Sequence, residues 1–190
     1  MFHMKPIVYS DAINRYIELL KEYNETTNIY SKSAYDKLDF HIQDGITLAS
    51  LIGNPTTIVD MGSGSGLPSV ILAIMHPKCK VIAVESKGRK AAFLNLVKSD
   101  LDLSNFEVIQ EDINQVMRTH KLKPHIITAK AFAPYDKAIE IASKIAAPGC
   151  ELWIPISQVQ HEALSAIPKP GFKLVKVDGT GFFYLKKKWT

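Results

Sequence analysis

Three glycines alternate with serines shortly after an acidic side chain, in the segment that runs from Asp60 to Leu67. The β-branched residues Ile58 and Val59 precede this segment and predict a buried strand, whereas the apolar run after Pro68 predicts a helix. Glycine accepts positive φ angles and has no side chain, so a ligand can lie against the bare peptide of such a loop. The pattern therefore predicts a ligand-binding turn between a strand and a helix.

The spacing of these glycines bears on which nucleotide the turn could bind. A dinucleotide fingerprint needs a third small residue, and counting from Gly62 that position is Leu67. Counting from Gly64 it is Ser69, which passes only as a small residue. A carboxylate at Asp60 would repel a pyrophosphate but suits the ammonium group of S-adenosylmethionine. We therefore expect Asp60, Gly62 and Gly64 to bind S-adenosylmethionine rather than NAD(P), with a simple tight turn as the remaining alternative.

Acidic residues at two further strand ends could bind the rest of a nucleoside. Glu85 ends the second predicted strand, about twenty residues beyond the loop, where a carboxylate can accept hydrogen bonds from both ribose hydroxyls. After the third predicted strand, Asp112 could accept from an adenine amino group while Ile113 packs against the ring. These positions predict nucleoside binding, although Glu85 suits NAD and the methyl donor equally.

A cation and two aromatic residues follow the fourth predicted strand. Phe132 or Tyr135 could stack on a flipped nucleobase, and Lys130 could hold a phosphate or a carboxylate. The alternative is that Phe132 belongs to the core and Lys130 is simply exposed. This strand end is where the donor's methyl group would have to emerge, so we expect the substrate here.

The basic residues permit a polyanionic partner without requiring one. The chain carries a net charge of +4, and Lys87, Arg89 and Lys90 cluster at the start of a predicted helix, where cations oppose the helix dipole. We therefore expect this cluster to contact phosphates rather than to be an ordinary solvated face. His41 and Asp44 lie one turn apart on an earlier predicted helix, either as a surface pair or facing the substrate.

Strands and helices alternate along most of the chain, which predicts a mostly parallel, doubly wound sheet with one antiparallel edge strand. Two helices precede the first strand, so we expect a single domain in which residues 1–53 form a helical cap on an α/β core of residues 54–190. Residues 172–177 and 181–185 predict a closing hairpin around Asp178-Gly179-Thr180.

Composition bounds the remaining possibilities. The 190 residues are 46% hydrophobic and 22% charged, as in ordinary globular proteins. The N-terminus does not resemble a signal peptide, and no uncharged apolar run is long enough to span a bilayer. Cys79 and Cys150 are in no metal-ligand spacing, so we expect buried thiols and no metal site. We expect a cytoplasmic monomer.

Several motifs together resemble the RsmG (GidB) family of bacterial methyltransferases, which act on N7 of a guanine in small-subunit (16S) ribosomal RNA. The segments that carry the resemblance are Tyr23-Asn24 with Asn28-Ile29-Tyr30-Ser31, His41-Ile42-Gln43-Asp44, the loop from Asp60 to Pro68, Glu85 to Lys90 with Phe93-Leu94, and Ala129-Lys130-Ala131-Phe132-Ala133. The Leu-Pro ending of the glycine loop is more specific to the family than the glycines themselves.

The resemblance implies a fold, a cofactor and residue roles. It implies a class I (Rossmann-like) S-adenosylmethionine-dependent methyltransferase with a seven-stranded sheet, acting on 16S rRNA or the small ribosomal subunit. Gly62 and Leu67 would contact the donor, Glu85 its ribose, and Ile113 and Asn114 its adenine side. Lys130 would occupy the family's arginine position at the reaction centre, in a cofactor or substrate contact. We place His41, Phe132 and the basic cluster on the RNA side.

The sequence departs from the family in ways that leave alternatives open. Lysine in place of arginine loses a planar bidentate fork, and the family's Leu-Lys-Gly after the fifth strand is absent. A small-molecule methyltransferase and a non-catalytic RNA-binding or ribosome-assembly protein are the two rival hypotheses. No general base is expected, because N7 of guanine carries a free lone pair at neutral pH.

Overall fold

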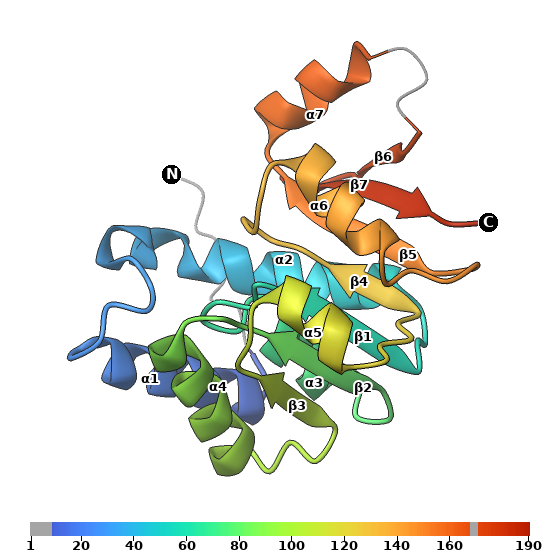
Figure 1. The fold of residues 1–190 in the computed structure, drawn as a ribbon. Coiled ribbons are helices and arrows are strands. Elements are labelled where there is room, and N and C mark those ends of the chain that lie inside the picture. Colours follow the sequence, from blue (N-terminus) through green and yellow to red (C-terminus); the bar gives the residue numbers. More distant parts are fainter. Residues whose placement is uncertain (1–8, 168–170) are drawn as a thin grey trace, which may run out of the picture.

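A seven-stranded sheet forms the centre of the computed structural model, which describes residues 9–167 and 171–190 (Figure 1). The strand order is β3-β2-β1-β4-β5-β7-β6. Five strands are parallel, and β7 pairs antiparallel with both β5 and β6. The strands are β1 (Thr57–Met61), β2 (Lys80–Val84), β3 (Phe106–Ile109), β4 (Ile126–Thr128), β5 (Glu151–Ile156), β6 (Lys173–Lys176) and β7 (Phe183–Lys188). The mostly parallel sheet with an antiparallel edge is confirmed, with β7 one place in from that edge.

Helices cover both faces of the sheet and divide the core in two. On one face, side chains from α1, α2, α3 and α4 pack against the strands, and on the other those from α5, α6 and α7 do so. Figure 1 shows α5 and α6 in front of the sheet, and α7 beside the β6–β7 hairpin. The helices are α1 (Asp11–Asn24), α2 (Leu38–Leu51), α3 (Ser69–Met75), α4 (Gly88–Asp100), α5 (Ile113–Thr119), α6 (Tyr135–Ser143) and α7 (Gln158–Ser165).

The central strands are apolar on both faces because helices cover both. Alternate residues of β1 illustrate this, since Ile58 joins one half of the core and Val59 the other. Cys79 and Cys150 are buried as predicted, and burial raises the pKa of both thiols to about 11. Within residues 9–167 and 171–190, no helix is both long enough and apolar enough to cross a membrane.

A buried asparagine shapes the connection between the first two long helices. The side-chain oxygen of Asn24 accepts from the amides of Ile29 and Tyr30, and its nitrogen donates to the Tyr30 carbonyl and the Tyr35 hydroxyl. The chain then forms a 3₁₀ turn (Lys32–Lys37) before α2 starts at Leu38. The two long helices before β1 are thus separated by this asparagine-bound segment and the 3₁₀ turn.

Helix α1 is fixed to the part of the molecule that carries the glycine loop. The buried hydroxyl of Tyr16 donates to the carbonyl of Ser65, in that loop, at 2.8 Å. The Tyr23 hydroxyl donates to the Arg89 carbonyl at 3.3 Å, and Arg15 makes a bidentate ion pair with Asp100 on α4. The helices before β1 thus hold the loop from outside the sheet.

Removing the Tyr16 hydroxyl tests this contact. Tyr16→Phe leaves a buried carbonyl without its donor, so we expect the free energy of unfolding to fall by about 1–3 kcal/mol in urea denaturation. Tyr23→Phe is the matched control, because its hydroxyl is only partly buried, and it should cost less than about 1 kcal/mol. Equal losses in the two variants would show that the Tyr16 bond has no special role.

Candidate functional site

The carboxyl ends of the parallel strands meet at one edge of the sheet, and the glycine loop lies at its centre. The amides of Gly62 and Ser63 both donate to the carbonyl of Val84, at 2.9 and 3.0 Å, which fixes the loop to the end of β2. Gly62, Gly64 and Gly66 all have positive φ angles, of 70°, 59° and 99°. The loop thus has the backbone conformation that the sequence predicted.

The three glycines serve different purposes. A Cβ atom on Gly62 would meet the Phe132 ring at 2.6 Å, and one on Gly66 would meet Val70 of α3 at 2.5 Å. Around Gly64 the nearest atom is the Gly62 carbonyl oxygen at 3.9 Å. Packing therefore requires glycine at two of the positions, and the open peptide surface lies at Gly64. The sequence alone did not distinguish them.

Glu85 lies directly against this open peptide. One of its carboxylate oxygens accepts from the Gly64 amide and the other from the Lys87 amide, both at 2.8 Å. A carboxylate oxygen has two lone pairs, so each oxygen can accept one more hydrogen bond. The predicted contact of Glu85 with a ribose stays a prediction.

Asp60 is fully buried beneath the loop. One oxygen accepts from the Thr128 hydroxyl at 2.6 Å, whereas the other has no hydrogen-bond partner among residues 9–167 and 171–190. Burial raises the pKa of this carboxyl, and the hydrogen bond from Thr128 opposes that rise. Burying a carboxylate oxygen without a hydrogen-bond partner costs free energy of folding. This oxygen is therefore a candidate acceptor for a cationic group of a ligand.

The turn after β3 uses its polar residues to start a helix. Asp112 is the N-cap of α5, and one of its oxygens accepts from both the backbone and the side-chain nitrogen of Asn114. Ile113 is 3% exposed, and Leu67 is also almost completely buried. The predicted adenine contacts of Asp112, Ile113 and Asn114 and the predicted donor contact of Leu67 stay predictions. Among the described residues, the second Asp112 oxygen accepts no hydrogen bond.

Lys130 is already paired, which the sequence did not indicate. Its ammonium nitrogen lies 2.7 Å from Asp44 Oδ2, and Tyr184 on β7 donates its hydroxyl to Asp44 Oδ1, also at 2.7 Å. The side chains of Lys130 and Asp44 are only 17% and 7% exposed. Asp44 was predicted only as half of a pair with His41, and nothing in the sequence linked Tyr184 to either residue.

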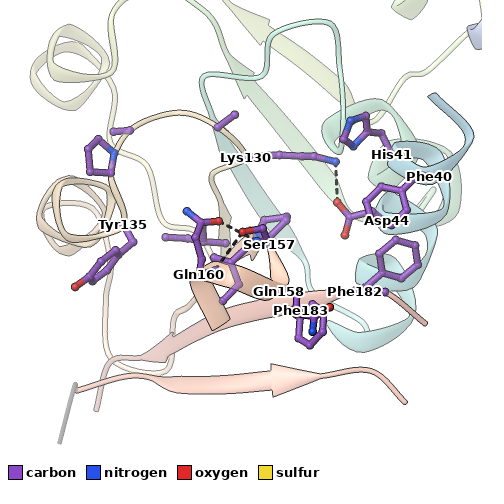
Figure 2. A pocket seen from close by; sticks show the side chains of 17 residues that line it. Phe40, His41, Asp44, Lys130, Tyr135, Ser157, Gln158, Gln160, Phe182 and Phe183 are labelled. Atoms are coloured by element: carbon purple, nitrogen blue, oxygen red, sulfur yellow. Dashed lines mark hydrogen bonds and ion pairs between the residues drawn. The ribbon is translucent and has the colours of Figure 1, made fainter. Parts of the chain in front are cut away.

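A pocket of about 460 Å³ opens beside this ion pair (Figure 2). Helix α2 contributes Phe40 and His41 to its wall, and Figure 2 shows Tyr135 on the opposite side from Phe182. Burial and the nearby Lys130 charge lower the pKa of His41, whose buried Nδ1 atom has no hydrogen-bond partner in the part of the chain that the structure describes. The pocket therefore combines aromatic walls, a neutral imidazole and an ion pair without net charge.

Phe132 lies outside this pocket. Its ring contacts Gly62 and packs against the second half of the core, so the structure places it beside the glycine loop rather than among the residues that line the cavity. Its predicted stacking on a base stays a prediction. Tyr135, the other residue predicted to stack on a base, does line the pocket. Phe40 and Phe182 were not identified from the sequence, because they lie on elements far from Tyr135 in the chain.

The basic cluster lines a separate hollow of about 470 Å³. Lys87, Arg89 and Lys90 surround it together with Asn28, and the side chains of the first two are exposed. The hollow lies between the segment after α1 and the start of α4. The predicted phosphate-contacting residues are thus gathered around one concave surface.

Comparison with known proteins identifies the family of this chain. Residues 10–168 match the family model of rRNA small subunit methyltransferase G. The chain belongs to this family. Ribosomal RNA small subunit methyltransferase G of Nitrosomonas eutropha is 30% identical over 137 residues, covering 72% of this chain and 63% of that protein. The protein of the same name from Brachyspira hyodysenteriae is 36% identical over 136 residues, which cover 71% of this chain and 65% of that protein. The matched part thus spans less than two thirds of both relatives.

Solved structures resemble this family member in fold. The cofactor-bound protein Rv0187 from MTB superimposes with a TM-score of 0.69 at 14% identity, over 97% of this chain and 92% of that one. A methyltransferase from Geobacter sulfurreducens gives a TM-score of 0.67 at 15% identity, over 97% and 92%. At these identities the likeness concerns the fold, and it confirms the Rossmann-like methyltransferase architecture.

The buried Asp60 predicts a dependence of stability on pH. Because its pKa is raised in the folded state, its contribution to stability is fully present at acid pH and is lost as the pH rises through the folded pKa. Asp60→Asn cannot ionise, so the stability of the variant relative to wild type should be greater at pH 7 than at pH 4. Thermal unfolding of both proteins across this range measures the difference. A difference between variant and wild type that does not change with pH would show that folding does not raise the pKa of Asp60.

Proposed function

We propose that this protein transfers a methyl group from S-adenosylmethionine to N7 of a guanine in the 16S RNA of the small ribosomal subunit. The observation that carries the proposal is the adjacency of two sites: the glycine loop with its two acidic residues, and the aromatic pocket beside Lys130. The segment after β4 joins them, since Phe132 contacts the loop while Lys130 and Tyr135 line the pocket. Family membership supports the same activity.

The residues at the glycine loop fit the chemical groups of the methyl donor. The unpartnered Asp60 oxygen is an acceptor suited to the donor's ammonium group, and the open peptide at Gly64 leaves room for its chain. Glu85 has the remaining lone pairs for both ribose hydroxyls, and Asp112 has a free oxygen for the adenine side. S-adenosylmethionine supplies a methyl group on a positively charged sulfur.

Methylation at N7 demands positioning more than proton transfer. N7 of guanine is an unprotonated nucleophile at neutral pH, so the protein has to hold it in line with the methyl group at near-attack distance. Aromatic walls such as Phe40 and Phe182 can stack on a base taken out of its helix, which offsets part of the few kcal/mol that unstacking costs. The low pKa of His41 keeps its ring uncharged beside Lys130.

The hollow around the basic cluster is suited to the RNA backbone. Its cations can replace counterions along the phosphates of RNA, which gives an affinity for RNA that does not depend on the nucleotide sequence. Tyr23 links this region to the cap through the Arg89 carbonyl, so α1 and the basic cluster are held together. We treat the division into a cap and an α/β core, and the monomeric state, as predictions.

Transfer of labelled methyl groups to RNA tests the proposal directly. With tritiated S-adenosylmethionine and either purified 16S rRNA or small subunits, we expect label at a single guanine, which borohydride reduction and aniline cleavage at N7-methylguanine locate. Glu85→Gln should weaken donor binding in calorimetry by about tenfold. Label on small molecules but not on RNA would favour the first rival hypothesis, and RNA binding without label the second.

Charge reversal tests the RNA-binding surface separately. Arg89→Glu with Lys90→Glu should weaken RNA binding and flatten the slope of log K against log salt by up to about one unit per lost phosphate contact. Lys98→Glu, at the other end of α4, is the matched control with the same charge per substitution. If the slope flattens equally per substitution in both variants, the basic cluster contributes only through the overall charge of the protein.

A further inference from the structure

The ion pair of Lys130 and Asp44 forms part of the wall of the aromatic pocket, and its two charges cancel. We propose that these two side chains read the base itself, with Asp44 accepting from the N1–H and amino groups of guanine and Lys130 donating to O6. This inference rests on the proposed function and assigns the specificity of that site. It gives Lys130 a different partner from the phosphate or carboxylate expected from the sequence.

The pairing argues against an anionic occupant of this pocket. A phosphate that drew Lys130 to itself would leave Asp44, of which 7% is exposed, as a nearly buried carboxylate without a counterion. Removing one partner of such a pair is strongly destabilising, because the remaining charge is uncompensated. A neutral ligand that donates to one partner and accepts from the other leaves the pair intact.

The free hydrogen-bonding capacity of the pair matches the guanine edge. Lys130 uses one of three N–H donors on Asp44, and Asp44 Oδ2 accepts only from Lys130 among the described residues. A donor and an acceptor thus lie 2.7 Å apart, next to aromatic walls that can sandwich a ring. Guanine presents an acceptor, O6, beside donors at N1 and the amino group, whereas adenine presents them in the reverse order. O6 lies between N1 and N7 on the purine, so this contact leaves N7 free.

The same contact would favour the reaction. Methyl transfer forms the bond between N7 and the methyl carbon and breaks the bond from that carbon to sulfur, which keeps the electron pair. Positive charge passes to the purine ring, and a carboxylate that accepts from N1–H becomes a better partner as this charge develops. Asp44 is thereby a specificity-determining residue that also stabilises the product side of the transfer.

Tyr184 is a positioning residue for Asp44. Its buried hydroxyl donates to Asp44 Oδ1 at 2.7 Å and lies 3.1 Å from the Asp44 carbonyl oxygen. Because Oδ1 is held in this way, Oδ2 is the atom that faces Lys130 (Figure 2). The hydroxyl acts through Asp44 and does not line the pocket.

Replacement of the target guanosine by inosine tests the reading of the base. Inosine keeps N7, O6 and N1–H but lacks the amino group, so wild type should methylate guanosine-containing small-subunit RNA at least about tenfold faster in kcat/KM. Asp44→Asn should lose about tenfold or more on guanosine and reduce this preference to nearly one. Donor affinity, measured by calorimetry, should stay within about twofold of wild type, since Asp44 lies outside the donor site.

Control variants separate reading from folding. Tyr184→Phe should lower kcat/KM while keeping the preference for guanosine, and Glu140→Gln, which loses an exposed ion pair with Lys137, should change neither. If Asp44→Asn does not fold, the double variant with Lys130→Gln removes both charges and should show the same loss of preference. An unaltered preference in these Asp44 variants, or an equal loss on both substrates, would overturn the inference. A wild-type protein that labels no RNA would instead refute the proposed function.

Discussion

Asp44 is the residue at which three parts of the molecule meet. It lies on α2, which precedes the sheet, and it binds Lys130 at the end of β4 and Tyr184 on β7. Charged and hydroxyl groups this deeply buried are tolerated only when their hydrogen bonds are satisfied, so the three elements must keep a fixed spacing. The aromatic pocket depends on that spacing, since α2, the segment after β4 and the start of β7 all contribute to its walls, together with β5, α6 and α7.

The glycine loop is likewise held in place by contacts to several elements. Gly66 allows α3 to approach, Gly62 accommodates the Phe132 ring, and the Tyr16 hydroxyl holds the loop from α1. A loop fixed at three points presents the peptide at Gly64 in one conformation. Preorganisation of this kind lowers the entropy that a ligand must lose on binding.

Local patterns in the sequence were sufficient to predict the fold and to place the polar residues at the ends of the parallel strands. The strand, glycine loop and helix around Asp60 are encoded within a few positions, and parallel strands bring their carboxyl ends to one edge whatever the details. Contacts between distant elements could not be predicted. Lys130 was expected to be free for an anion, because nothing local to it reveals a partner 86 positions away. Likewise, the three glycines are alike in sequence and differ only in what packs against them.

The distance along the chain between Asp44 and Tyr184 has a consequence for folding. Their contact closes a loop of 140 residues, and β7 has to enter between β5 and β6, whereas β1, β2 and β3 assemble through short strand–helix–strand units. Loop-closure entropy makes distant pairings late events. We therefore expect the half of the molecule that carries the glycine loop to become ordered first, and the pocket to be completed only when the β6–β7 hairpin docks.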